Sequence, residues 1–136
     1  MKVIRKDVTI PWDVDKTLIF WQPTGAERHE SDIQMNYYGE IISVTPHLEM
    51  LQLLRSNLAR GRNIIIWSGN GFAWAEEVVK KLHEAGHLPD TKGIIIMTKP
   101  AGYADDLDCQ HWMGNRIYIE PHSNPYAEEK KRHEEA

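Results

Sequence analysis

The sequence predicts an α/β fold in which a parallel β-sheet carries helices on both faces, giving three layers. Three short runs rich in β-branched and aromatic residues are bounded by turn-forming residues, as buried parallel strands usually are: 7–12, 64–67 and 94–97. Segments with apolar residues at helical spacing lie between them. Strands that alternate with helices along one chain are typical of this fold class.

The first strand is expected at about 7–12, with Pro11 near its end. A polar stretch at 24–34 then predicts an exposed loop, and the residues 37–42 predict a hairpin arm. Little chain remains between Leu18 and Thr45 for a separate cap domain, so we expect a minimal cap or none.

Two helices are predicted. The first begins at Thr45-Pro46, with Thr45 as its N-cap and Pro46 at the first helical position. Its apolar residues recur at helical spacing: Leu48, Leu51, Leu54 and Leu58. The second runs from about 72 to 85 and ends at Gly86, a plausible C-terminal cap.

Two further short strands are expected near the carboxyl end of the chain, at 102–104 and at 115–119. The last residues, about 128–136, are a dense mixture of charges to which we assign no function.

Composition limits the class of protein. With 136 residues, of which 41% are hydrophobic, the chain has the size of one ordinary domain. Its formal net charge of -4 gives no basic footprint for non-specific nucleic-acid binding. The single Cys109 excludes an internal disulfide framework, and no apolar run is long enough to span a membrane. We therefore expect a soluble, cytoplasmic protein without a membrane partner.

Two carboxylates, Asp13 and Asp15, follow the first predicted strand. If the chain turns after Asp13, both reach one small volume at the carboxyl edge of the sheet, where open α/β sheets bind ligands. One carboxylate could then attack an electrophile while the other moves a proton, and together they could hold Mg²⁺. Taken alone, the pair slightly favours a turn or a helix N-cap instead.

Three more polar elements follow apolar strand-like runs in the same way: Ser68, Lys99 and the pair Asp105-Asp106. Each has an ordinary structural explanation. Ser68 would cap the helix that follows it, Lys99 would be solvated, and the aspartates would open a helical segment. Together with the pair Asp13 and Asp15, these make four polar elements at successive strand ends, and that recurrence favours a functional site.

These four motifs, in this order, resemble those of the haloacid dehalogenase-like (HAD) superfamily of phosphatases and phosphotransferases. The similarity covers nearly the whole chain, from Val8 to Ile119, and residues 13–18 match the first motif. It implies a single Rossmann-like, three-layer α/β/α domain over 1–136. Lys16 departs from the pattern, since many members have Gly there. The gap between the third and fourth motifs is also unusually short.

The resemblance implies a phosphatase. Asp13 would be the nucleophile that forms an aspartyl-phosphate, and Asp15 would protonate the leaving oxygen and later activate water. Ser68 would bind phosphoryl oxygens and Lys99 would compensate their charge. Mg²⁺ would be the cofactor, held by four residues of which Asp106 is the preferred ligand of the fourth motif: Asp13, Asp15, Asp105 and Asp106.

The substrate is expected to be a phosphomonoester of unknown identity. A cluster of aromatic residues near the proposed mouth makes a nucleotide or polynucleotide end a minority interpretation, since bases stack on such rings, although such residues more often fill a core: Trp12, Trp21, Tyr37, Tyr38, Trp67 and Trp74. The other alternative is a catalytically inactive HAD-like binding or structural protein. No histidine pair indicates zinc, and dimerisation is left open.

Overall fold

A parallel sheet of three strands lies at the centre of the computed structural model, which describes residues 8–22 and 30–120. Its strand order is β1-β5-β6, formed by β1 (Thr9–Asp13), β5 (Asn63–Ser68) and β6 (Ile94–Thr98). Ile64 of β5 pairs with Ile10 on one side and Ile94 on the other. The protein is thus a mixed α/β protein, and the three strands expected from the apolar runs are confirmed.

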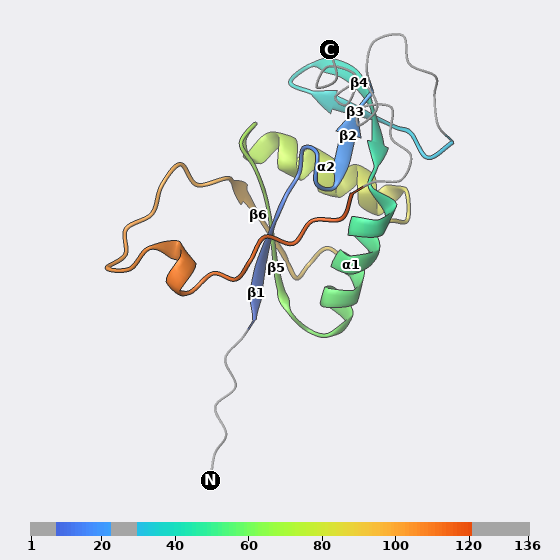
Figure 1. Ribbon diagram of the computed structural model, residues 1–136. Coiled ribbons are helices and arrows are strands. Elements are labelled where there is room, and N and C mark those ends of the chain that lie inside the picture. The colour runs from blue at the N-terminus through green and yellow to red at the C-terminus, as the bar shows by residue number, and fades with distance from the viewer. Residues whose placement is uncertain (1–7, 23–29, 121–136) are drawn as a thin grey trace, which may run out of the picture.

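A second, antiparallel sheet stands above the carboxyl ends of these strands (Figure 1). It contains β2 (Ile19–Trp21), β4 (Glu40–Pro46) and β3 (Ile33–Tyr37), in that spatial order. The turn between β3 and β4 is Tyr38-Gly39, with φ of 50° and 93°. Positive φ at both positions is typical of a two-residue type I′ hairpin. The expected hairpin arm is confirmed, and β2 joins it as a third strand.

Both helices, α1 (Leu48–Ala59) and α2 (Phe72–Glu84), lie on the same side of the parallel sheet, which Figure 1 shows nearly edge-on. The strand order explains this. Successive right-handed crossovers that move in one direction across a sheet deliver their helices to one face. The helix α2 ends as expected, with Gly86 at φ 84° just beyond its C-cap.

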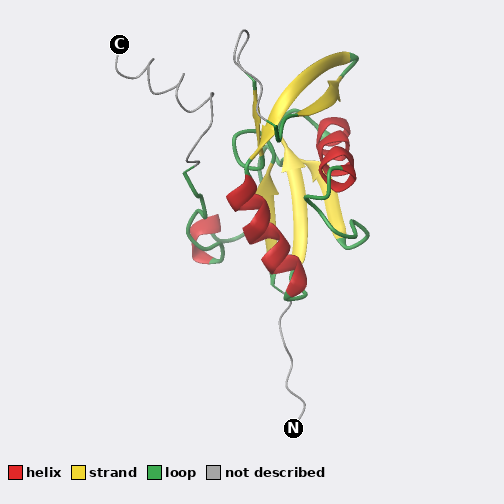
Figure 2. Ribbon diagram, turned by 90° about the vertical axis from the view of Figure 1, so that its right-hand side faces the viewer, coloured by secondary structure: helices red, strands yellow, loops and turns green. Residues whose placement is uncertain are grey.

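Burial along the strands agrees with a sheet that is covered fully on one face. Ile64 and Ile66 of β5 have no exposed surface, whereas the alternate residues Ile65 and Trp67 are half-buried. On β6, Ile95 is 54% exposed. Because alternate residues of a strand point to opposite faces, the face away from α1 and α2 is partly open. The expected helices on both faces are not found among the described residues, and Figure 2 shows α1 and α2 from their own side.

The two strands expected near the carboxyl end are also absent, since 102–104 and 115–119 pair with no strand in the described part of the chain. The first part of the segment after β6, orange in Figure 1, instead extends away from the sheet, and the part that follows it, in red, returns to the body of the protein, where the Ile119 oxygen binds His47. The helical element in the described part of this segment is a 3₁₀ turn at Cys109–His111. Tyr103 and Ile117 are more than half exposed. An apolar run becomes a strand only where a neighbour supplies ladder hydrogen bonds, and none lies beside these residues.

The start of α1 differs from the expectation as well. Thr45 and Pro46 belong to β4, and the N-cap is His47, whose Nδ1 accepts a hydrogen bond from the Met50 N–H. Its Nε2 then donates to the backbone oxygen of Ile119, 2.6 Å away. A histidine that accepts at one ring nitrogen and donates at the other can thus cap a helix while buried.

The apolar core lies between the parallel sheet, the two helices and the hairpin sheet. Of the predicted leucine stripe of α1, Leu51 and Leu54 are fully buried, whereas Leu48 is 53% exposed. Neither described helix is long and apolar enough to cross a membrane. The charged tail at 128–136 and most of the predicted loop at 24–34 lie outside the described residues.

Candidate active site

The chain turns sharply after β1, as the sequence analysis requires. The backbone oxygen of buried Val14 accepts hydrogen bonds from the N–H groups of Thr17 and Leu18, at 3.3 and 2.9 Å. Lys16 adopts a left-handed conformation with φ 66°. That conformation costs an L-residue with a side chain more than it costs glycine.

Asp13 ends β1 and faces a lysine. Its Oδ1 lies 3.9 Å from Nζ of Lys99, which follows β6. Burial raises the pKa of Asp13, while the Lys99 charge and hydrogen bonds from the Val14 N–H and the Thr17 side chain lower it, and the Asp15 charge raises it. The net direction is upward, so burial outweighs the lysine. Both side chains remain partly exposed, at 34% for Asp13 and 49% for Lys99, so a ligand can reach the pair.

Asp15 is held by four side-chain donors. The indole N–H groups of Trp21 and Trp74 donate to its Oδ1, at 2.9 and 3.0 Å. The Ser68 hydroxyl and the Asn70 amide donate to its Oδ2, at 3.1 and 3.0 Å. An ionised carboxylate offers about four acceptor positions. All of them are used here, so an incoming ligand can bind an oxygen of Asp15 only in place of one of these donors.

Ser68 is fully buried at the end of β5, and it links the other members of the site. Its hydroxyl oxygen accepts from the Asn70 N–H at 3.0 Å while it donates to Asp15. Its backbone oxygen accepts from the Lys99 N–H at 2.9 Å, which fixes the start of the loop after β6 beside the loop after β5.

Ser68 does not cap the helix that follows it. The N-cap of α2 is Gly71, and the Phe72 N–H at the start of the helix donates to the Thr98 hydroxyl of β6 instead, at 2.9 Å. The structure therefore brings together four of the six residues predicted from the sequence: Asp13, Asp15, Ser68 and Lys99.

Asp105 and Asp106 are not joined to this group. Asp105 is exposed, and its Oδ1 accepts a hydrogen bond from the Leu107 N–H at 3.0 Å, which lowers the pKa of Asp105. This is the local turn that the sequence analysis gave as the alternative. Their segment extends away from the sheet in Figure 1, in orange. Among residues 8–22 and 30–120, no three His, Cys, Asp or Glu side chains are grouped to hold a metal ion.

A metal ion could still bind through a single protein carboxylate. Mg²⁺ commonly keeps several waters and binds through one or two protein carboxylates plus phosphate oxygens of the substrate. Asp13 is partly exposed and offers such a carboxylate. Asp15 does not offer one in this arrangement, because its oxygens are occupied by protein donors.

Three residues of the predicted aromatic cluster, Trp21, Tyr37 and Trp74, form the wall behind Asp15. The ring of Tyr37 contacts Trp21 and Trp74 edge-on, with centroids 4.8 and 5.1 Å away. Trp74 is only 1% exposed, so it offers no face on which a base could stack, whereas Tyr38 at the hairpin tip is 62% exposed. Trp12 belongs to the core. Sequence spacing indicated the cluster but not its hydrogen bonds to Asp15.

Asn70 is thus the site residue that sequence reasoning missed, and it also missed the role of Trp21 and Trp74 as hydrogen-bond donors to Asp15. Asn70 follows Ser68-Gly69 in the loop after β5, and its polar character at a strand end was the available signal. The two tryptophans carried no such signal, because a tryptophan in a small α/β protein usually serves the core.

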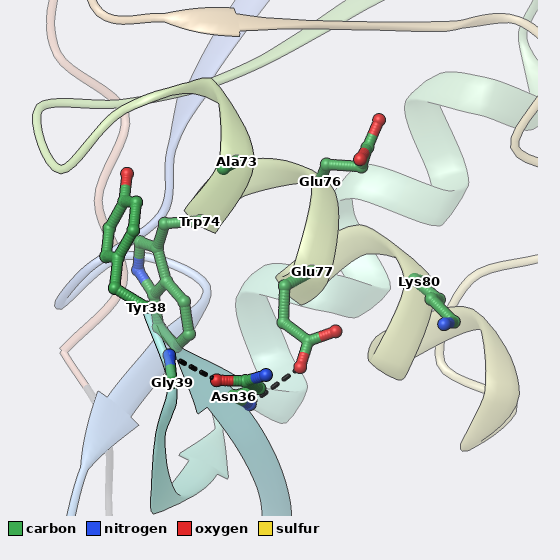
Figure 3. Close-up of a pocket in the computed structure, with 8 residues that line it drawn as sticks. All are labelled: Asn36, Tyr38, Gly39, Ala73, Trp74, Glu76, Glu77 and Lys80. Atoms are coloured by element: carbon green, nitrogen blue, oxygen red, sulfur yellow. Dashed lines mark hydrogen bonds between the residues drawn. The ribbon is translucent and has the colours of Figure 1, made fainter.

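A pocket of about 300 Å³ lies beside this site, between the hairpin tip and α2 (Figure 3). Trp74 is part of its lining. Some of its polar groups are paired with one another: the Asn36 N–H donates to Glu77, and the Asn36 side chain accepts from the Gly39 N–H. The pocket is separate from the Asp13–Lys99 pair, which is not in its lining.

Comparison of the chain with protein-family models, curated proteins and solved structures gives no match.

Proposed function

We propose that this protein is a Mg²⁺-dependent, HAD-like phosphatase that hydrolyses a phosphomonoester through an aspartyl-phosphate on Asp13. The observation that carries the proposal is the pair at two strand ends, where Nζ of Lys99 lies 3.9 Å from Oδ1 of Asp13. Ser68 lies at the end of the strand between them, as the sequence motifs require.

The chemistry divides into two displacements. A carboxylate oxygen of Asp13 would attack phosphorus while the bond to the ester oxygen breaks, and the alcohol would leave with a proton. Water would then attack the phosphorus of the aspartyl-phosphate, releasing inorganic phosphate and the free carboxylate. Lys99 would offset the negative charge that gathers on the phosphoryl oxygens beside Asp13.

Asp15 would move the protons, which requires it to release one of its four donors. The Ser68 hydroxyl is the natural one to leave, because it can rotate from Asp15 Oδ2 toward a phosphoryl oxygen. That rotation would supply a hydrogen bond to the substrate and free an acceptor position on Asp15 in a single motion.

Mg²⁺, when bound, would neutralise charge on the phosphate and orient it toward the nucleophile. Asp13 would hold it first. Asp105 and Asp106 are proposed as further ligands, which requires their segment to move toward the end of β1, and the backbone of Asp15 is proposed as a fourth contributor.

The finer fold assignment is part of the same proposal: a Rossmann-like, three-layer domain with a minimal cap. Within the described residues, β1 has a hydrogen-bonded neighbour on one side only, and one face of the sheet is partly open. The sheet β2-β4-β3 is the only candidate cap among the described residues.

A second candidate is a catalytically inactive binding or structural protein with the same architecture. It is favoured by two observations: the acceptor positions of Asp15 are filled, and Asp105 is engaged in a local turn. A phosphatase specific for nucleotide or polynucleotide ends has less support, because Trp74 is buried.

Hydrolysis of a generic aryl phosphate in the presence of Mg²⁺ tests the proposal. Asp13→Asn is expected to lower kcat by at least about 10³-fold, because amide nitrogen and oxygen cannot form the intermediate. Asp90→Asn is the matched control, since Asp90 is an exposed loop residue outside the site, and it should retain wild-type turnover. Equal turnover by Asp13→Asn and wild type would reject the role of Asp13.

Thermal melting with Mg²⁺ and beryllofluoride separates the two candidates without a substrate. Beryllofluoride mimics a phosphoryl group attached to a carboxylate, and a ligand that binds only the folded state raises the melting temperature. We expect a rise for the wild type and none for Asp13→Asn. Absence of a shift in both proteins would favour the non-catalytic candidate.

A further inference from the structure

The loop after β5 is tied to the tip of the β3–β4 hairpin. The Tyr37 hydroxyl donates to Oδ1 of Asn70 at 3.2 Å, and the Tyr38 hydroxyl donates to the Asn70 backbone oxygen. Asn70 in turn donates from Nδ2 to Oδ2 of Asp15 at 3.0 Å. A continuous chain of hydrogen bonds thus runs from the hairpin tip through one asparagine to the proposed acid/base group.

The two ends of the Asn70 amide have distinct partners, which fixes its orientation. Its oxygen accepts from a hydroxyl and its nitrogen donates to a carboxylate. The reverse orientation would place the amide oxygen against an oxygen of Asp15, where neither atom is a donor. The Tyr37 hydroxyl therefore helps to keep the amide turned toward Asp15.

The hairpin tip also fits closely over the next residue of the loop. A Cβ atom at Gly71 would lie 2.7 Å from the Tyr38 hydroxyl oxygen, and Gly71 has φ of 105°. The backbone conformation favours glycine, and a side chain at this position would also push the Tyr38 hydroxyl aside. The tip and the loop are thus in direct contact, so a movement of one moves the other.

We infer that Asn70 is a positioning residue for Asp15, and that the β3–β4 hairpin acts on the reaction through it. The inference rests on the proposed function, since it concerns how Asp15 is aligned for proton transfer. Four donors hold Asp15. The two indole donors belong to the wall of the site and meet the Tyr37 ring only by edge contacts, and the serine is needed by the phosphate. Among the described donors to Asp15, Asn70 is the one that is itself hydrogen-bonded to the hairpin tip.

Alignment matters because proton transfer depends steeply on geometry. A displacement of about 1 Å at a reacting group can cost on the order of 100-fold in rate. When the Ser68 hydroxyl turns to the phosphate, Asn70 becomes the remaining donor to Oδ2 of Asp15. Without its amide, this oxygen would have no protein donor at the moment when a proton must move.

The test measures kcat and KM for an aryl phosphate with variants at each step of the chain. Asn70→Ala should lower kcat by about 10- to 100-fold with KM changed less than about twofold, because the amide aligns a group and does not bind the substrate. Asn70→Asp should lower kcat further, since it sets two carboxylates against each other. Asn63→Asp, the same change at the opposite end of β5, should match the wild type.

Tyr37→Phe tests whether the hairpin acts through Asn70. The single variant should lower kcat by less than Asn70→Ala does, and adding Tyr37→Phe to Asn70→Ala should cause no further loss. Two residues that act in one chain are non-additive, whereas a general loosening of the fold by Tyr37→Phe would lower kcat in both backgrounds. Wild-type kcat in Asn70→Ala, or a further loss in the double variant, would overturn the inference.

Failure of the proposed function has a different signature, namely no turnover by the wild type itself. In that case the same cycle is measured on the free energy of unfolding in urea. Tyr37→Phe should then destabilise the wild type but leave Asn70→Ala unchanged. Equal destabilisation in both backgrounds would show that the hairpin tip is not linked to Asp15 through Asn70.

Discussion

Lys16 is a residue whose backbone conformation and side chain are in conflict. It has φ of 66° in the turn between Asp15 and Thr17, where most L-residues are disfavoured by about 1–2 kcal/mol. The turn is nevertheless formed, because three backbone N–H groups converge on the Val14 oxygen and the buried Leu18 anchors its far end. The local strain is thus carried by tertiary packing.

Substitution at this position measures the strain. Lys16→Gly should be more stable than Lys16→Ala by about 1 kcal/mol, because both variants lose the lysine side chain and only glycine accepts the positive φ without cost. The measurement is the free energy of unfolding in urea for the two variants. Equal stability would show that the turn relaxes to an ordinary conformation when the lysine is removed.

The partly buried carboxyl of Asp13 makes the stability of the folded state depend on pH. Burial raises its pKa above the ordinary value of 3.8 despite the neighbouring Lys99. Below pH 3.8 the carboxyl is neutral in both the folded and unfolded states. As the pH rises, the unfolded chain ionises first, so the folded state loses stability until the pH has passed the raised pKa of the folded protein.

Asp13→Asn removes this titration, so the difference in melting temperature between the variant and the wild type should depend on pH. We expect the variant to melt at the same temperature as the wild type, or below it, in strong acid, and to gain on the wild type as the pH rises through the window above 3.8. Melting curves of both proteins across this range test the sign. A difference that is constant with pH would contradict it.

At the scale of elements, the contact between the hairpin and the loop after β5 decides the shape of the site. Gly71→Ala should destabilise the protein by more than Gly86→Ala does, although both glycines have positive φ, of 105° and 84°. A Cβ at Gly86 meets nothing within 4 Å, so that variant reports only the backbone cost, about 1 kcal/mol. The excess at Gly71 reports the collision with Tyr38 together with a larger backbone cost, because φ 105° with ψ 164° is a conformation restricted almost entirely to glycine.

Removal of the Tyr38 hydroxyl provides the control for this comparison. In a Tyr38→Phe background the excess cost of Gly71→Ala should fall but not vanish, because the atom that a Cβ would meet is gone while the backbone cost at Gly71 remains. The measurement is again the free energy of unfolding in urea. An unchanged excess would show that the hairpin tip shifts freely and does not press on the loop.

Among the helices and strands, some could be predicted from the sequence and others could not. The strands β5 and β6 and the helix α2 were predictable, since each is a local pattern of apolar residues with a turn or a glycine at its end. The start of α1 was not. Thr45-Pro46 carries the usual signal, but pairing with β2 draws both residues into β4 and leaves the cap to His47.

At the scale of the whole molecule, the limits of prediction have a common cause. The expected strands at 102–104 and 115–119 have suitable residues but no neighbouring strand, and strand formation depends on pairing more than on composition. The partners of Asp15 come from β2, the loop after β5 and α2, so only the assembled fold reveals them. Asp13, Ser68 and Lys99 were predictable because parallel strands end at one edge.

The strand order also determines how the proposed site would come apart. The strand β5, which ends at Ser68, is the only described strand of the parallel sheet with hydrogen-bonded neighbours on both sides, whereas β1 and β6 are edges. Edge strands fray before central ones as denaturant is added. Asp13 and Lys99 lie at the ends of those two edge strands, so the proposed nucleophile and its counter-charge would separate while most secondary structure persists. The proposed activity would then be lost at a lower denaturant concentration than the fold.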